Sequence, residues 1–146
     1  MGADEDRYRL ASVRDTRMRD ERVRRSDLAT AVGDAHATEQ MLATIAERVG
    51  DARARLTQAL AGRNALNSSG AAHLVLAERL VDRRRRELDD AVDHQRRASR
   101  AHDDRLGAVD VARTRLTAAR ADREVIDRHF ARWREERKRL AERRDD

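Results

Sequence analysis

Histidines and paired carboxylates are the side chains of this 146-residue chain that could hold a metal ion or transfer a proton. His94 and His102 lie two helical turns apart, and Asp103 and Asp104 follow the second. Only His36 would approach them from another helix, and two histidines alone do not fill a coordination shell. No H-E-x-x-H motif is present. We therefore expect no metal site and no cofactor.

The motifs of covalent and nucleotide chemistry are also missing. The chain has no cysteine, which excludes a disulfide framework, a thiolate metal site and a cysteine nucleophile. It contains no Gly-rich phosphate loop and no nucleophile elbow. Carboxylate pairs such as Asp89–Asp90 and Glu135–Glu136 are common in any chain with 42% charged residues. We expect that the protein is not an enzyme.

Arginine dominates the basic residues, because Lys138 is the single lysine among 33 Lys and Arg. The longest basic run, residues 83–86, would spread around a helix, and Asp82 and Glu87 flank it. The 28 acidic residues reduce the formal net charge to +5. Nucleic-acid binding asks for a sustained basic stripe with stacking aromatics. We expect no nucleic-acid partner, and a steep fall of affinity with salt would be the mark of one.

Composition indicates the elements that must carry these side chains. Hydrophobic residues make up 39%, but 26 of them are alanines, aromatics are 2%, and there is no proline. That bias is typical of long helices or a coiled coil rather than of a compact globule. No apolar run is long enough to span a membrane, and no apolar segment follows Met1. These features predict an all-α protein, and they allow a cytoplasmic location without showing it.

Turn-forming residues gather in one place. Gly62 and Asn64 precede Asn67-Ser68-Ser69-Gly70, whereas the other glycines are isolated. The sequence thus predicts one helix over about residues 5–66, a turn over about 67–70 and a second helix over about 71–143.

Each predicted helix carries a heptad pattern of core positions, a and d. In the second helix, a positions recur every seventh residue from Leu74 and d positions from Ala77, without interruption to Leu140. The first helix has a matching pattern from Leu28 to Leu66. Before Leu28 the same register meets charged residues (Arg14, Arg17, Glu21 and Arg24), while apolar residues drift to other positions. We expect a weaker seam there.

The two registers fit an antiparallel pair, in which an a position of one helix lies level with a d position of the other. They align when residues equally distant from Gly70 face each other. Leu66 then faces Leu74, Val49 faces Ala91, and a polar layer forms between Thr38 and His102. The prediction is a long two-helix antiparallel coiled-coil hairpin that is monomeric when isolated. Heptads alone leave a long parallel dimer open, and the turn cluster argues against it.

The three aromatic residues, Tyr8, Phe130 and Trp133, all lie near the two ends of the sequence. An antiparallel hairpin brings these ends together. The aromatics either close the open end of the coiled coil or form an interface for a partner, and the two roles are compatible.

Two segments near the ends of the sequence combine aromatic and aliphatic residues with arginines. The opening Tyr8-Arg-Leu10-Ala-Ser-Val13-Arg14-Asp-Thr-Arg17 is followed by Glu21. The closing motif is Ile126-Asp-Arg-His-Phe130-Ala-Arg-Trp133-Arg134-Glu-Glu136-Arg137. With the hairpin pattern, these motifs resemble the FliJ/YscO (SctO) family of type III secretion stalk proteins.

The resemblance implies a stalk without chemistry of its own, peripheral to the inner-membrane secretion apparatus. The end with both termini would enter the central hole of the hexameric export ATPase, and the turn would point to the cytoplasmic domain of the export-gate membrane protein. Export chaperones are further partners of some members. The Tyr-x-Leu opening favours the injectisome type over the flagellar type. The competing prediction is a generic coiled-coil scaffold or a secretion chaperone-binding protein, which would leave an ATPase unaffected.

Site residues follow by position from the same resemblance. The ATPase-facing set is Tyr8, Arg14, Arg17, Arg24, Phe130, Trp133 and Arg137. The gate-facing set is Leu66, Asn67, Leu74, Leu76, Leu80 and Arg83. Arginines at seam positions either meet an acidic partner or pack their stems in the seam while their heads reach water. Leu76 lies off the seam, where it is available to a partner or is ordinary surface apolarity. This turn lacks the aromatic residues that the family often has there.

Overall fold

Two long helices make up the chain in a computed structural model, which describes residues 8–66 and 70–145. Helix α1 spans Ala11–Asn64 and helix α2 spans Ala71–Asp145, and the described residues contain no strand. Helix α1 therefore begins later than the expected residue 5, because the amide of Ala11 is the first to close a turn, on the Tyr8 carbonyl at 3.1 Å. It also ends before Leu66, and α2 continues two residues past the expected end. The predictions for residues 5–7 and 67–69 lie outside the described residues.

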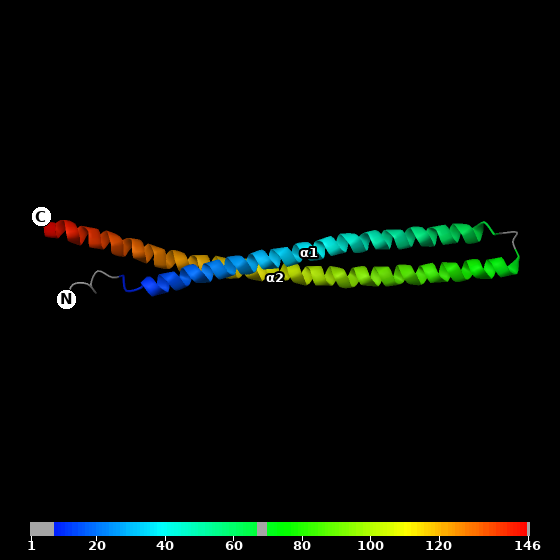
Figure 1. The fold of residues 1–146 in the computed structure, drawn as a ribbon, viewed down its shortest axis with the longest axis horizontal. Coiled ribbons are helices and arrows are strands. Elements are labelled where there is room, and N and C mark those ends of the chain that lie inside the picture. Colours follow the sequence, from blue (N-terminus) through cyan, green and yellow to red (C-terminus); the bar gives the residue numbers. More distant parts are fainter. Residues whose placement is uncertain (1–7, 67–69, 146) are drawn as a thin grey trace. The chain divides into compact units, whose positions relative to one another are not determined.

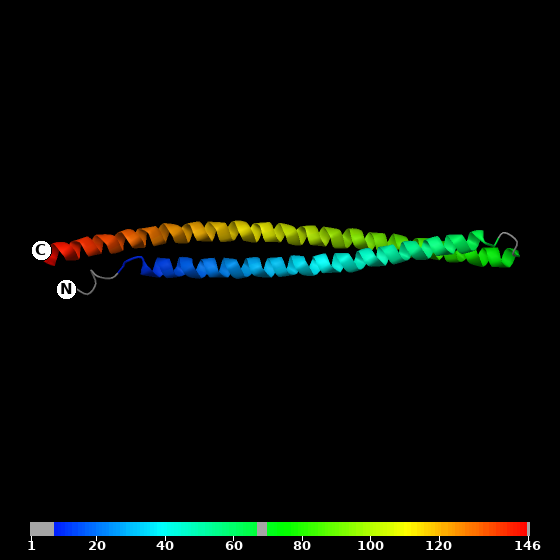
Figure 2. The same ribbon diagram turned by 90° about the horizontal axis from the view of Figure 1, so that it is seen from above.

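The chain forms two compact units. One, here the turn unit, is Gly33–Gly107, and the other, here the terminal unit, combines Met1–Val32 with Ala108–Asp146. Within each unit a segment of α1 lies antiparallel against a segment of α2, as Figures 1 and 2 show from two directions. The all-α fold class and the two-helix antiparallel hairpin predicted from the sequence are confirmed.

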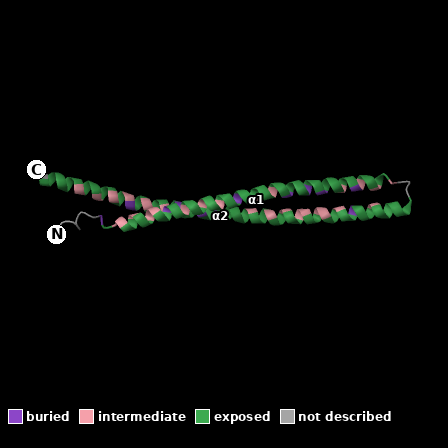
Figure 3. Cartoon of the chain, in the orientation of Figure 1, coloured by how far each residue is buried: buried purple, intermediate pink, exposed green. Residues whose placement is uncertain are grey.

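Burial follows the predicted heptads closely. Every buried residue of the two described helices occupies a predicted a or d position, from Ala35, Ile45 and Val49 in α1 to Val81 and Val109 in α2. Figure 3 shows that few residues of the two helices are buried and that the others are exposed or of intermediate burial. The seam between the helices buries little surface because alanine occupies many a and d positions. Its short side chain also lets the two helix backbones pack closely.

Polar contacts in the turn unit fix the register. Thr38 Oγ1 lies 2.8 Å from Nδ1 of His102, the pair that the registers predict. The same hydroxyl donates to the carbonyl of Ala35 at 2.8 Å. An ion pair of 3.3 Å joins Asp34 to Arg105 close by. The Thr38–His102 contact obeys the symmetry about Gly70, and the Asp34–Arg105 pair is offset from it by one residue.

The seam is more open near the turn. Leu66 is half-buried, but Leu74 is 42% exposed. The reason lies in the helix ends: α1 stops at Asn64, and Leu66 belongs to the following turn. Gly70 begins α2 by accepting backbone bonds from His73 and Leu74 at 3.0 and 3.4 Å.

Glycine inside these helices has no steric purpose. A Cβ atom added at Gly33, Gly50 or Gly107 would meet nothing within 4 Å, and no described glycine has a positive φ. Glycine in a helix interior costs about 0.5–1 kcal/mol relative to alanine. We expect Gly107→Ala to raise the free energy of unfolding by about that amount, measured by urea denaturation. Ala101→Gly on the same helix should lower it equally, and a destabilised Gly107→Ala variant would contradict this explanation.

Candidate functional site

An aromatic cluster in the terminal unit is formed by Tyr8, which precedes α1, and by Phe130 and Trp133 of α2. The Tyr8 ring lies 5.0 Å from Phe130 in an edge-on arrangement and 5.2 Å from Trp133, between ring centroids. Phe130 and Trp133 stack on each other at 5.7 Å. Three ATPase-facing residues predicted from the sequence are therefore together in space.

Local geometry explains the cluster. Phe130 and Trp133 are three residues apart on α2, at successive a and d positions, so both rings point to the same side. Tyr8 precedes α1, and its hydroxyl hydrogen-bonds Nδ1 of His129 at 3.0 Å. Tyr8 is only 7% exposed, whereas Phe130 and Trp133 are half-buried. Tyr8 thus anchors the segment that leads into α1, and the other two rings remain partly accessible.

A charged layer lies deeper in the seam than the aromatic cluster. Glu21 is 4% exposed and occupies an a position. Its carboxylate lies 3.0 Å from Arg25, 3.6 Å from Arg120 and 2.9 Å from Arg123. Burying a carboxylate is costly unless cations compensate it, and here three guanidinium groups do so. The Arg123 Nε–H is an imperfect partner: it is buried and close to Glu21, but its direction does not satisfy a hydrogen bond.

Arg14 is engaged inside the hairpin. Its Nε lies 2.9 Å from the Asp127 carboxylate, and its guanidinium stacks over the Phe130 ring at 4.3 Å. Asp127 also meets Arg123 at 3.7 Å. A change at Arg14 would disturb the charged layer and the aromatic cluster together, so its effect on a partner would be mixed with an effect on the fold.

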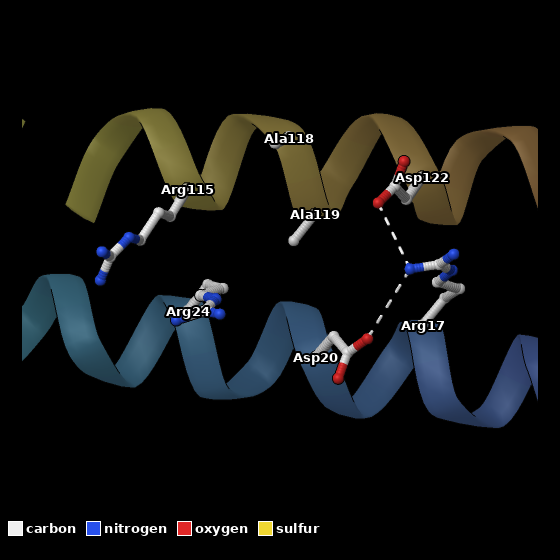
Figure 4. Close-up of a pocket in the computed structure, with 7 residues that line it drawn as sticks. All are labelled: Arg17, Asp20, Arg24, Arg115, Ala118, Ala119 and Asp122. Carbon is white, nitrogen blue, oxygen red and sulfur yellow. Dashed lines mark hydrogen bonds and ion pairs between the residues drawn. The ribbon is translucent and has the colours of Figure 1, made fainter. Parts of the chain in front are cut away.

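A cleft of about 300 Å³ lies between the two helices of the terminal unit, and Figure 4 shows its lining. At one end Arg17 lies between two carboxylates, 3.4 Å from Asp122 and 4.0 Å from Asp20. Ala118 and Ala119 line the middle, where their short side chains leave the space unfilled.

The other end of the cleft is cationic. Arg24 and Arg115 approach it from opposite helices (Figure 4). Arg24 pairs only with Asp27 on its own helix, at 3.3 Å, and Arg115 has no ion pair or hydrogen bond within the described residues. Two guanidinium groups over a small apolar surface suit a carboxylate from a partner protein.

Sequence reasoning identified part of this site. It selected Arg14, Arg17 and Arg24, but it assigned no role to Arg115. It also treated Glu21 as a residue of a weakening seam. The position of Arg115 could have been predicted from the sequence, because the register that places Arg24 at a d position puts Arg115 beside it on the opposite helix. Arg137, the remaining residue of the predicted set, is half-buried and has an interaction of its own.

The predicted gate-facing residues lie in the turn unit. Leu76 is 61% exposed and Leu80 is 42% exposed, as is Leu74. Arg83 is less available, because its Nε donates to Glu87 at 3.1 Å. Hydrogen bonds from Arg84 first, and also from Arg83, hold the pKa of Glu87 below its usual value. Asn67 lies outside the described residues.

Other kinds of site find no support in the described part of the chain. Residues 8–66 and 70–145 contain no group of three or more His, Asp or Glu side chains placed to hold a metal ion. No described helix has an apolar stretch long enough to cross a membrane. Comparisons of the chain with protein-family models, with curated proteins and with solved structures found no match.

Proposed function

We propose that this protein is the central stalk of a type III secretion export apparatus, of the FliJ/YscO type. In this proposal it binds no nucleotide and catalyses no reaction. It works in the cytoplasm, peripheral to the inner-membrane secretion apparatus, as a link between the hexameric export ATPase and the export gate. The injectisome type is favoured by the Tyr-x-Leu opening.

One observation carries the proposal: the terminal unit combines half-buried aromatic rings with a cationic cleft at the end that the family inserts into its ATPase. Phe130 and Trp133 offer apolar edges, and Arg24 and Arg115 offer guanidinium groups. Interface hot spots are enriched in these residue types. The arrangement would suit a ring-shaped partner whose inner surface carries carboxylates.

The ion pairs within the hairpin refine which arginines would contact the ATPase. Arg14 and Arg17 are held by acids of α2, so they would mainly shape the surface. Arg24 and Arg115 would meet the partner directly. The export-gate protein would bind at the turn unit through exposed leucines, and export chaperones are further candidate partners there.

Neutralising the cleft tests this assignment. We expect the double variant Arg24→Gln/Arg115→Gln to stimulate the cognate hexameric ATPase less well. The concentration of the chain needed for half-maximal stimulation should rise about tenfold or more, because two charge-assisted contacts are lost. The steady-state rate of ATP hydrolysis, titrated with the purified chain, measures this. The matched control is Arg48→Gln/Arg97→Gln, one exposed arginine from each helix of the turn unit.

Two outcomes would count against parts of the proposal. Equal stimulation by the cleft variant and its control would remove Arg24 and Arg115 from the interface. No stimulation by the unaltered chain would remove the stalk function itself.

A generic coiled-coil scaffold or chaperone-binding protein is the alternative. The exposed Leu76, Leu80 and Val125 favour it, since such side chains suit partner helices as well as an export gate. This alternative predicts a stable complex with a helical partner and an unchanged rate of ATP hydrolysis.

A further inference from the structure

The outward-facing positions of α2, c and f of its heptad, change character abruptly along the helix. From Arg79 to Asp104, all eight of these positions carry charge, and the five from Arg128 to Glu142 do so as well. Between these two stretches, the positions within the terminal unit are uncharged: Val111, Thr114, Ala118, Ala121 and Val125. We call this set the outer stripe.

Side chains of the outer stripe are exposed, so the hairpin does not use them for its own packing. Val111 is 50% exposed and Val125 is 61% exposed. Thr114 donates its hydroxyl hydrogen to the carbonyl of Asp110 at 3.1 Å, which satisfies its donor within the helix and leaves its methyl group for contact. A single exposed valine needs no explanation. Five successive uncharged positions in a chain with 42% charged residues do.

Spacing makes the outer stripe a second seam. Its members recur at intervals of three and four residues, the pattern with which one helix packs against another. Alanine at its centre would allow close approach of a helix backbone, and the valines on either side would supply the apolar contact.

Charges along the edges of the outer stripe indicate the chemistry of the occupant. On the edge that borders the cleft, Asp122 is paired with Arg17, so Arg115 is the charge left to meet a partner. Ala118 belongs to both the outer stripe and the cleft lining, which makes the two surfaces continuous. On the opposite edge Asp110 is paired with Arg113 at 3.8 Å, whereas the exposed carboxylate of Glu124 has no ion pair within the described residues. A partner would therefore place a carboxylate, not a cation, beside Arg115.

We infer that the outer stripe of α2 is the docking surface for an amphipathic helix of a partner protein. The occupant has small or aliphatic residues at heptad spacing and an acidic residue beside them, which reaches Arg115 at the edge of the cleft. This interface goes beyond the proposed stalk function and does not depend on it, because it concerns a helix lying alongside the hairpin rather than entry into a ring.

A pair of labelled peptides tests the inference directly. The probe is a four-heptad helical peptide with isoleucine and alanine at its a and d positions, glutamate along the edge that faces Arg115 and glutamine along the other edge. Its twin has lysine in place of each glutamate. Fluorescence anisotropy against the full chain should show tighter binding of the glutamate peptide by about tenfold or more, because only it can pair with Arg115.

Three variants of the full chain separate the contributions. Val125→Arg should weaken binding of the glutamate peptide at least about tenfold, because it places a charge in the apolar contact. The control Leu106→Arg alters a leucine that is 46% exposed and lies outside the outer stripe, and it should leave binding unchanged. Arg115→Gln should remove most of the preference for glutamate over lysine. Circular dichroism of each variant reports that the helices are intact.

Several results would overturn the inference. Equal binding of the glutamate and lysine peptides by the unaltered chain would reject the acidic occupant. Equal effects of Val125→Arg and Leu106→Arg would reject the outer stripe as the docking surface. A mass that doubles with concentration and returns to that of a monomer in Val125→Arg would assign the stripe to a second copy of this chain instead. If the unaltered chain does not stimulate the ATPase, the stalk function fails, but the peptide-binding measurements still decide whether the outer stripe is a docking surface.

Discussion

Replacing Glu21 with alanine should destabilise the hairpin by about 1–3 kcal/mol. The carboxylate is 4% exposed and compensates Arg25, Arg120 and Arg123. Its removal leaves three cations around one layer of the seam. The loss stays below that of a fully buried pair because these arginines are partly exposed and their heads can turn to water.

Urea denaturation followed by helical circular dichroism measures the effect, with Glu39→Ala as the matched control. Glu39 lies on the same helix, and its side chain is 70% exposed. Its replacement should change stability by less than about 0.5 kcal/mol. Equal midpoints for the two variants would show that the charged layer does not stabilise the terminal unit.

Truncation of Ile45 to alanine is the second large effect. Ile45 is 2% exposed at a d position of the turn unit. Removing buried methyl and methylene groups from a packed site costs about 2–5 kcal/mol, and the thin seam here places the expected loss toward the lower end, at about 2–3 kcal/mol. Stiff neighbouring helices would close the cavity only partly.

Met41, one turn earlier on α1 and 57% exposed, provides the comparison. Met41→Ala should shift the denaturation midpoint only slightly, since its side chain already contacts water. A shift as large as that of Ile45→Ala would mean that the outer face of α1 is covered, for instance by self-association.

Much of the fold was predictable because heptad patterning determines which residues are buried. The sequence places Ile45, Val49 and Val81 at core positions, and the structure buries all three. The antiparallel symmetry about Gly70 also predicts the Thr38–His102 contact, which is confirmed. Two registers and one turn cluster leave little freedom to a chain of this composition.

Helix ends and charged core positions were harder to predict. Whether a helix continues for another turn depends on a few backbone bonds, and local sequence does not settle these. Before Leu28 the drift of apolar residues suggested a weaker seam, yet the original register continues and buries Glu21 while Val23 stays 56% exposed. The register is kept because ion pairs across the helices replace apolar contacts, and such pairs are visible only once both helices are aligned.

The sequence could identify candidate residues for the site, but it could not predict which of their charges are paired within the hairpin. The sequence could select Arg14, Arg17 and Arg24 as arginines at seam positions. It could not tell that Asp127 and Asp122 hold the first two, because the acids lie more than a hundred residues away in the chain. The outer stripe becomes visible only when the positions left over from the seam are considered together.

Site-specific crosslinking tests the central claim, the insertion of the terminal unit into the export ATPase, most directly. The chain has no cysteine, so each introduced cysteine is a unique attachment point. Exposed Glu136 of the terminal unit and exposed Ala71 of the turn unit would each be changed to cysteine and labelled with a photoreactive maleimide. In a mixture with the cognate hexameric ATPase, we expect crosslinks from Glu136→Cys to the inner surface of the ring and none from Ala71→Cys. Crosslinks from Ala71→Cys alone, or from neither position, would contradict the proposed stalk.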